Sequence, residues 1–538
     1  MTTRILDRGY LEKGLFWGLL ALSLLPTLLF EHFPSEDGAL HVANASVYLN
    51  ADSPLFSEYY QLEYFPVPNL LADLGLAGLL SFMAPPLATK VMVVVLAVGM
   101  ALAIRWCLTL LGNDSLWLAV FAIPIAVGRF HHFAYLNFVM GLALSFAVFG
   151  YWLRFIRARR PPAWQWPMLA VLVFLVYLSH AFPFLILLLM FGAAGLDDAI
   201  EEARRGGGSL IGNLARGLMP VVGVSLVPLA LVGVFSSGQG GMSYLHGPIS
   251  RILRFPVYPI AVLSSYEVVI ATLFALAVLI LVVSALKAGR SSWRIDPGFL
   301  VATLFLLVAY MVVPDYIGDG ADVPARIAVY AFVLTLFWLS SRPVAQWVRV
   351  GGTVAAVAVV IGLVAVRIPN HAVLDEEISE YMSGQVVVEP GSTVLPLWLT
   401  EIDQGRGPGG GRRLVRPLVE QVGDLTFNGD VVDLHHLPAS LDLALFRFAP
   451  GRDIRDTAEE SEPFPFVFGP GMVDIARYEA MGDGSVDYVW LWGRAELDPT
   501  LLESEQARSM LDQIDQGFEL VFTSEPSGML EVYRRRDA

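Results

Sequence analysis

Cysteine and charged residues are scarce in this chain of 538 residues. It has one cysteine, Cys107, and only 16% of its residues are charged, against about 25% in an ordinary soluble domain. A single cysteine excludes a disulfide framework, and the absence of a regular glycine period excludes a collagen-like fibre. The 55% of residues that are hydrophobic form runs too long for one soluble core, so we expect a membrane protein.

The negative charge of the chain is concentrated in its last third. The formal net charge is −15, yet the residues after 369 carry 31 acidic and 13 basic side chains, a net charge of −18. The residues before that point carry 19 acidic and 22 basic side chains, a net charge of +3. We therefore expect two bodies, a multi-span membrane part over residues 1–369 and an acidic polar domain over residues 370–538.

Lysine and arginine indicate which loops lie on which side of the membrane. Neither occurs from Glu31 to Thr89, so the first loop, over residues 31–86, is expected outside the cell. Basic clusters mark cytoplasmic loops at 154–160, 204–216, 287–294 and 342–349. The parity of crossings agrees with this if the proline-bounded run 66–85 lies along the surface as a juxtamembrane helix, which we favour because the run is shorter than a bilayer core needs. If the run does cross, an even number of the short spans must be re-entrant instead.

Eleven apolar segments remain as predicted membrane spans, which places the N-terminus in the cytoplasm and the acidic domain outside. Basic residues precede the first span and no cleavage site follows it, so a retained signal anchor is favoured over a cleaved signal peptide. Arginine supplies 32 of the 35 basic residues, which is typical of a GC-rich bacterial genome. For a multi-pass chain of this kind we expect the bacterial inner membrane. The predicted spans cover about residues 15–30, 87–107, 116–128, 137–153, 167–179, 182–195, 217–235, 267–286, 298–313, 326–341 and 350–367.

The outer loops of this topology hold a concentrated set of polar residues. Glu36, Asp37 and His41 follow the first span directly. Several arginines also lie outside, against the positive-inside tendency, and histidines accompany them. These further candidates for binding a substrate or its phosphate are Arg129, His131, His180, Arg251, Arg254 and Arg326.

Structural explanations compete with the functional ones. Glu36 and Asp37 are either a functional pair or solvated residues that cap a helix starting just after them. Arg251 and Arg254, at i and i+3 on one helical face, either bind a phosphate or anchor to lipid headgroups. His180 separates two short apolar helices, where a buried, hydrogen-bonded histidine is the commoner role.

Metal binding is not favoured by the remaining outer residues. His131 and His132 are consecutive, so their side chains point in different directions and do not share one ligand site. Asp315, Asp319 and Asp322 lie among glycines and a proline, which is typical of turns.

The opening of the first outer loop suggests a family. A first span is followed by the acidic pair Glu36 and Asp37, then Gly38 and His41. The segment FPVPNLLADLGLAGLLSFM precedes a second span that ends near Arg105 on the cytoplasmic side. This arrangement resembles the GT-C superfamily of integral-membrane glycosyltransferases, whose first outer loop opens with an acidic residue and contains a proline-led juxtamembrane helix. A C-terminal extracytoplasmic domain is also common in its bacterial members.

The resemblance implies a reaction on the outer side of the membrane. A sugar moves from a polyprenyl-phosphate or polyprenyl-diphosphate donor to a glycan, lipid or protein acceptor. Asp37 is then the general base, with Glu36 as its substitute. Guanidinium groups stabilise the leaving phosphate, and Arg251, Arg254 and Arg326 are candidates by topology. The acidic pair is not a D-x-D pattern, so a divalent metal is not supported; no other cofactor and no nucleic acid is expected.

The acidic domain is predicted to be a small α/β or α+β unit. A helix is expected over 501–514, before a hairpin about the turn SEPSG. Apolar segments predict strands at 385–390, 392–399, 441–448, 486–493 and in the hairpin 518–536. The glycine-rich segment 405–413 lacks the following Lys-Ser/Thr of a phosphate loop, and His435 and His436 lack metal-ligand spacing. We therefore assign this domain to the recognition of an acceptor or a protein partner.

Two other functions compete with glycosyl transfer. A non-catalytic membrane scaffold of the same architecture would bind a protein through its outer domain. A transporter is disfavoured because ionisable residues within the spans are few, Glu267 and His180 being the clearest, and no repeated halves are present. Loss of the glycan product on replacement of Asp37 by Asn, with the protein still folded and abundant, would distinguish the enzyme from the scaffold.

Overall fold

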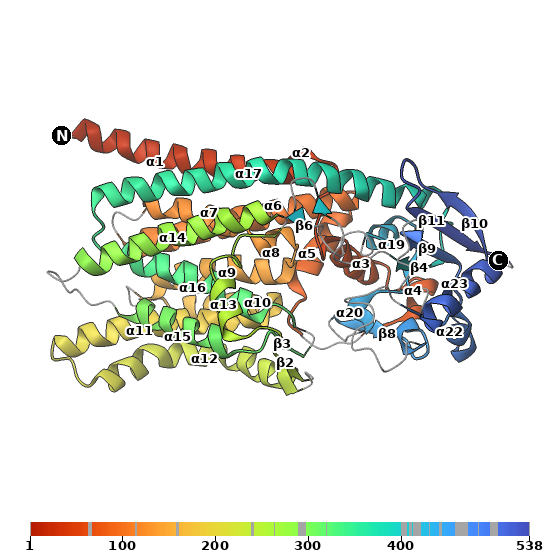
Figure 1. Cartoon of the computed structure of the whole chain (residues 1–538). Coiled ribbons are helices and arrows are strands. Elements are labelled where there is room, and N and C mark those ends of the chain that lie inside the picture. The colour runs from red at the N-terminus through yellow and green to blue at the C-terminus, as the bar shows by residue number, and fades with distance from the viewer. Residues whose placement is uncertain are drawn as a thin grey trace.

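The computed structural model shows an elongated helical bundle joined at one end to a smaller domain that contains a sheet (Figure 1). The described residues are 2–62, 67–112, 116–157, 161–237, 241–262, 264–288, 297–318, 320–399, 406–407, 411–412, 421–429, 431–440, 444–457, 472–482, 484–494 and 504–536.

Seven helices of the described residues are long and apolar enough to cross a membrane. The bundle is therefore that of a multi-pass membrane protein. These helices are α6 (Pro85–Leu111), α9 (Leu136–Tyr151) with its π-helical extension η2 (Trp152–Arg157), α11 (Ala181–Arg204), α12 (Leu210–Ser237), α14 (Ser265–Ala288), α16 (Val323–Ser340) and α17 (Gln346–Met382).

The other predicted spans also coincide with helical segments, but these are shorter or interrupted. Pro26 begins a new helix after the first one ends, since proline cannot donate a hydrogen bond to the preceding turn. These segments are α1 (Thr2–Ser23) with α2 (Leu25–Leu29), η1 (Leu116–Phe121) with α7 (Ala122–Ala126), α10 (Gln165–Ser179) and α15 (Gly298–Val312).

The first outer loop folds into short helices. It contains α3 (Gly38–Leu49), α4 (Pro54–Tyr59) and α5 (Leu71–Leu80). The 10 residues of α5 extend only about 15 Å, half the thickness of a hydrocarbon core. It packs on α3 through apolar side chains such as Ala72 and Leu76. The segment predicted to lie along the surface is thus a short helix that does not span the bilayer.

A buried ion pair joins two of the long helices. Arg367 of α17 donates through Nε to Oε1 of Glu267 on α14, at 2.9 Å. Its other nitrogens donate to the backbone carbonyls of Val127 and Ile260. Both charged side chains are almost completely buried. The charge at Glu267, which was considered as a transport residue, is therefore neutralised inside the bundle.

The smaller domain is built on a five-stranded mixed sheet in the order β10-β11-β9-β4-β7. β4 runs parallel to β7 and β9, and the hairpin of β10 and β11 extends the sheet antiparallel to β9. The hairpin and the preceding helix α23 (Glu505–Gly517) confirm two sequence predictions. The strands are β4 (Thr393–Trp398), β7 (Val432–Asp433), β9 (Tyr488–Trp492), β10 (Phe518–Thr523) and β11 (Leu530–Arg535).

One long helix connects this domain to the membrane part. Helix α17 continues unbroken through Pro369 to Met382, so the predicted boundary near 369 falls inside a helix. The segment after it, expected as a strand, is instead the 3-10 helix η3 (Ser383–Val387).

The first outer loop also contributes to the core of this domain. Strand β1 (Tyr60–Leu62) pairs antiparallel with β8 (Phe446–Phe448), and Phe56 and Tyr60 pack among the domain's buried side chains. The short helix α19 (Gly423–Gly429) contacts α3. The first loop and the C-terminal domain are therefore folded together.

Candidate functional site

The acidic pair lies at the start of α3, where the bundle meets the C-terminal domain (Figure 1). Glu36 and Asp37 are both half-buried, and α3 begins at Gly38. Asp37 occupies the N-cap position, but its side chain makes no capping hydrogen bond. Its backbone N–H donates to the carbonyl of Phe133 at 2.9 Å, which ties the pair to the second outer loop.

Arg129 comes from that second loop, and the charge of Glu36 acts on it. It begins the short helix α8 (Arg129–His132) and donates to Oδ2 of Asp322 through Nε at 3.1 Å and Nη2 at 2.8 Å. Its guanidinium lies over the ring of Phe133 at 4.3 Å. Burial lowers the pKa of Arg129, but the charge and hydrogen bond of Asp322, helped by Glu36, outweigh this and raise it. Arg129 is therefore a permanent cation beside the pair.

Arg326 approaches the same place from the first turn of α16. Its guanidinium lies over the rings of Tyr135 and Phe138, and Nη1 contacts Nε2 of His180. The carboxylates of Asp37 and Asp322 are close enough to act on it electrostatically. Its Nε is buried and has no hydrogen-bond partner, and no carboxylate forms an ion pair with it among the described residues. Arg326 thus keeps donor capacity for an anion.

Tyr135 marks the centre of this cluster. Burial raises the pKa of its phenol, and the negative charges of Glu36, Asp322 and Asp37 raise it further, while Arg129 opposes them. The hydroxyl therefore stays protonated near neutral pH and is able to donate a hydrogen bond. The first loop, the second loop and the start of α16 are brought together around this one side chain.

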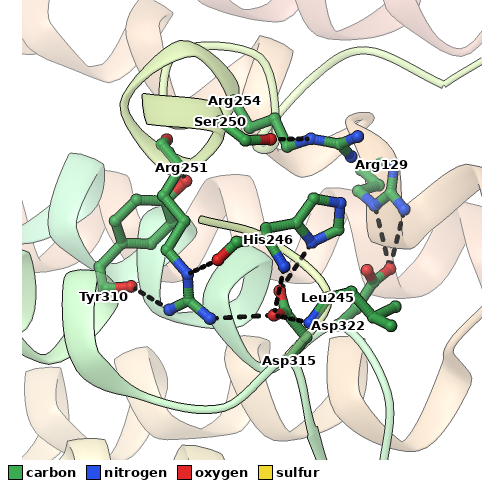
Figure 2. Close-up of polar contacts among 9 residues, drawn as sticks. All are labelled: Arg129, Leu245, His246, Ser250, Arg251, Arg254, Tyr310, Asp315 and Asp322. Carbon is green, nitrogen blue, oxygen red and sulfur yellow. Dashed lines mark hydrogen bonds and ion pairs between the residues drawn. The ribbon is translucent and has the colours of Figure 1, made fainter. Parts of the chain in front are cut away.

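Arg251 and Arg254 lie three residues apart on the short helix α13 (Pro248–Arg254), but their contacts differ (Figure 2). Arg251 is only 2% exposed. It donates to Oδ2 of Asp315 at 2.9 Å and to the backbone carbonyls of Tyr310 and His246 at 2.8 and 3.1 Å. Since Nε, Nη1 and Nη2 are each bound to protein oxygens, Arg251 holds this loop in place, and the structure does not support it as a phosphate ligand.

Asp315 is the other half of this clamp. Besides Arg251, it accepts from Nδ1 of His246 and from the backbone N–H groups of Leu245 and His246 (Figure 2). Burial raises its pKa, but these hydrogen bonds outweigh burial and lower it. Of the three aspartates expected in turns, Asp315 therefore anchors a loop and Asp322 pairs with Arg129; Asp319 lies outside the described residues.

Arg254 is exposed and lies beside Arg129 (Figure 2). It donates to Oγ of Ser250 at 3.1 Å and also interacts with the phenol of Tyr258, over whose ring Arg129 lies at 5.6 Å. Within the described part of the chain no carboxylate pairs with it. Arg254 and Arg129 thus present two guanidinium groups on one side of the cluster.

His131 and His180, the other predicted ligands, are held by the protein. His131 is buried, its Nε2 lies 3.3 Å from Oγ1 of Thr27, and its ring packs against Phe33. Burial lowers its pKa to about 3, and nearby Arg367 contributes, so the ring is neutral. The Nδ1 atom of His180 accepts from the backbone N–H of Phe182 at the start of α11. His131 is therefore packed in the core, whereas His180 keeps its contact with Arg326.

Sequence reasoning missed a carboxylate in this region. Asp73 of α5 is 1% exposed, and its Oδ1 lies 2.5 Å from Nδ1 of His41. The amide groups of Asn44 and Asn137 also donate to Asp73. In the sequence Asp73 is a single charge in an otherwise apolar segment, a pattern that does not by itself indicate a site. No group of histidine, cysteine and carboxylate side chains suited to a metal ion occurs in the described ranges.

Comparisons with known proteins place the fold. No family model matches the sequence, and no curated protein matches it either. Among solved structures, the crystal structure of ArnT from Cupriavidus metallidurans in the apo state is similar over 98% of both chains, with a TM-score of 0.50 and 10% sequence identity. The chain therefore has a GT-C-type fold that includes a small C-terminal domain with a sheet, as its sequence predicted.

Proposed function

We propose that this chain is a glycosyltransferase that moves a sugar from a polyprenyl-phosphate donor to an acceptor on the extracytoplasmic side of a bacterial inner membrane. The observation that carries the proposal is the convergence of Glu36 and Asp37 with Arg129 and Arg326 at the end of the bundle that adjoins the C-terminal domain. The GT-C-type fold supports the same function.

Asp37 is proposed as the general base that removes a proton from the acceptor. It lies at the start of a helix without a capping hydrogen bond from its side chain, it is half-buried, and its charge acts on Tyr135, His41 and Arg326. The proton transfer frees the acceptor oxygen to attack the anomeric carbon as the bond to the donor phosphate breaks. Glu36 lies next to it and is the substitute base.

The arginines are proposed to hold the phosphate that leaves. Arg326 has a buried Nε without a partner, and Arg254 has no carboxylate partner among the described residues. Arg129 shares its charge with Asp322, so it contributes less. Guanidinium donors stabilise the charge that the phosphate gains in the transition state.

The segment around Arg254 suits a lipid-linked donor. On α13, Ile249, Ile252 and Leu253 are 76%, 61% and 69% exposed. Helix α13 packs on the apolar helix α15. An isoprenoid chain covering them would bring its phosphate to Arg254.

The orientation of the chain follows from the charges at the two ends of the bundle. The N-terminus and the turns that join α11 to α12 and α16 to α17 lie at the end away from the C-terminal domain (Figure 1). Those turns carry Arg204, Arg205 and Arg342, so we propose that this end is cytoplasmic and that the C-terminal domain is outside.

The test is replacement of Asp37 by Asn, followed by mass spectrometry of the glycosylated envelope product in cells. We expect product formation to fall about 100-fold or more while the protein remains folded and abundant. Asp52→Asn, at an exposed carboxylate of the same loop, is the matched control and should leave product unchanged. If product persists in both Asp37→Asn and Glu36→Gln, the base assignment is wrong; a protein that never yields product but still recruits a partner would be a scaffold.

A further inference from the structure

A buried chain of hydrogen bonds runs from the C-terminal domain to His41 in the first outer loop. Its members are between 1% and 7% exposed. They come from four separate elements: His41 and Asn44 from α3, Asp73 from α5, Tyr60 from β1 and His436 from the loop between β7 and α20 (Leu437–Ser440).

The contacts connect these side chains end to end. The hydroxyl of Tyr60 lies 3.2 Å from Nδ1 of His436, and Nε2 of His436 lies 2.9 Å from Oδ1 of Asn44. Nδ2 of Asn44 donates to Oδ2 of Asp73 at 3.1 Å. Oδ1 of Asp73 lies 2.5 Å from Nδ1 of His41. The chain thus crosses from a residue of the C-terminal domain to a residue one helical turn after Asp37.

One arrangement of hydrogens satisfies the contacts from His436 to Asp73, while the hydroxyl of Tyr60 has a second acceptor in the carbonyl of Asp433 at 3.4 Å. Burial lowers the pKa of His436 to about 3, so its ring is neutral and carries one N–H. That hydrogen must be on Nε2, because the amide oxygen of Asn44 can only accept, and Nδ1 then accepts from the hydroxyl of Tyr60. A flipped Asn44 would place its oxygen against the carboxylate of Asp73, acceptor against acceptor. Asp73 therefore fixes the orientation of Asn44, and Asn44 fixes the tautomer of His436, whose Nε2–H in turn holds the amide oxygen in place.

His41 is the end point of the chain. Its backbone N–H donates to the carbonyl of Asp37 at 3.0 Å, so the two residues lie one turn apart on α3. Burial lowers the pKa of His41, but the charge and hydrogen bond of Asp73, with a smaller contribution from Asp37, outweigh it and raise the pKa. The only side-chain hydrogen bond of His41 among the described residues is the one at Nδ1.

The other charged groups near α3 are few. Asp424 of α19 is buried where that helix packs on α3; a Cβ on neighbouring Gly423 would lie 2.1 Å from the carbonyl of Ala39. Lys90 of α6 is occupied by the carbonyl of Phe30 at 3.1 Å. Of these surroundings, only Asp73 is hydrogen-bonded to His41.

We propose that Asp73, Asn44, His436 and Tyr60 are positioning residues that hold His41 as a charged donor beside Asp37. Through Nε2–H, His41 then binds an oxygen of the substrate whose sugar is transferred. The C-terminal domain is thereby a structural part of the site and not only a recognition module. The role in catalysis rests on the function proposed above, whereas the state of His41 is testable without it.

The experiment measures the titration of His41 in the full chain in lipid nanodiscs. Exchange of the imidazole C2 hydrogen with deuterium, followed by mass spectrometry of His41 peptides, gives the midpoint for that residue. The variants are Asp73→Asn, His436→Leu and Tyr60→Phe, of which the last removes a single hydroxyl and is the safest for folding. His435→Gln is the matched control, because this neighbouring buried ring packs on Trp398 instead of Asn44.

We expect the midpoint of His41 above 6.5 in the unmodified chain. Asp73→Asn should lower it by about 1–3 pH units, and His436→Leu and Tyr60→Phe should lower it in the same direction by less. The pH above which transfer activity declines should fall together with the midpoint of His41, so that these variants lose more activity at pH 8 than at pH 6. An unchanged midpoint in both His436→Leu and Tyr60→Phe, or an equal fall in His435→Gln, would overturn the inference.

The failure of the proposed function would look different. If the unmodified chain transfers no sugar but the midpoint of His41 moves as expected, the positioning network stands and the enzyme assignment falls. If activity is present and the midpoint does not move, the enzyme assignment stands and the network has no influence on His41.

Discussion

The two arginines of α13 allow a sharp test, because they lie three residues apart and are used differently. Arg251→Met keeps most of the side-chain volume but removes the charge and three hydrogen bonds, to Asp315, Tyr310 and His246. Arg254→Met removes an exposed guanidinium that contacts only Ser250 and Tyr258 among the described residues. Arg251→Met should therefore destabilise the loop, and Arg254→Met should weaken binding of the donor phosphate.

The structure sets the expected size of each effect. Breaking a buried ion pair from one side costs about 3–5 kcal/mol, and the low end applies here because Asp315 keeps its bonds to His246 and Leu245. About 3 kcal/mol raises the population of the locally opened loop roughly 100-fold. An exposed substitution changes stability by no more than about 0.5 kcal/mol. Loss of a charged hydrogen bond to phosphate should raise the KM for the donor about tenfold.

Chymotrypsin cleavage after Phe255 reports the opening of this loop. That ring ends α13 and packs against Tyr310 and Phe332, so it is cleaved only when the segment opens. Cleavage should be about 100-fold faster in Arg251→Met and within about twofold of the unmodified chain in Arg254→Met. The division of roles would be refuted if Arg251→Met stayed protected, or if Arg254→Met opened as readily.

Two further changes test the core and the outer domain. Arg367→Met should lower the free energy of unfolding by about 3–5 kcal/mol, because Glu267 would be left buried without its cation. The double variant Arg367→Met with Glu267→Gln should recover part of this stability. An equal loss of stability in the single and the double variant, measured by thermal denaturation, would contradict the prediction. Burial raises the pKa of Asp424 and Asp433 to about 7 from 3.8, so the folded chain keeps protons that the unfolded chain releases, and stability falls as the pH rises from about 4 to about 7. Replacing both by Asn should flatten this dependence between pH 4 and pH 7, by at most about 4 kcal/mol for each carboxyl; a pH dependence unaltered by the replacements argues against it.

Local sequence patterns were sufficient to predict the arrangement of helices in the membrane part. Apolar runs located eleven helical segments, and the acidic pair was expected just before a helix that does begin at Gly38. The few arginines that run against the positive-inside tendency include Arg129 and Arg326, on which the charges of Glu36 and Asp37 respectively act. These features depend on composition and short spacing, which a single sequence displays.

Long-range pairings were beyond such patterns. Arg251 and Arg254 share a spacing, but only the position of Asp315, 64 residues away from Arg251, makes one of them internal. His436 was set aside for lacking metal-ligand spacing, and its partner Asn44 lies 392 residues earlier. Asp73 is a single charge in an apolar segment, and nothing local indicates that α5 packs on α3. Each of these depends on which elements meet after folding.

The central claim is that the cluster of Asp37 with Arg326 and Arg254 binds a lipid-linked phosphate. The most direct measurement is a cryo-electron microscopy structure of the chain in nanodiscs with a polyprenyl phosphate. We predict density for the phosphate within hydrogen-bonding distance of Arg326 or Arg254, on the side facing Asp37, with the isoprenoid chain over α13. A phosphate bound elsewhere on the bundle, with these arginines directed to headgroups or water, would contradict the account.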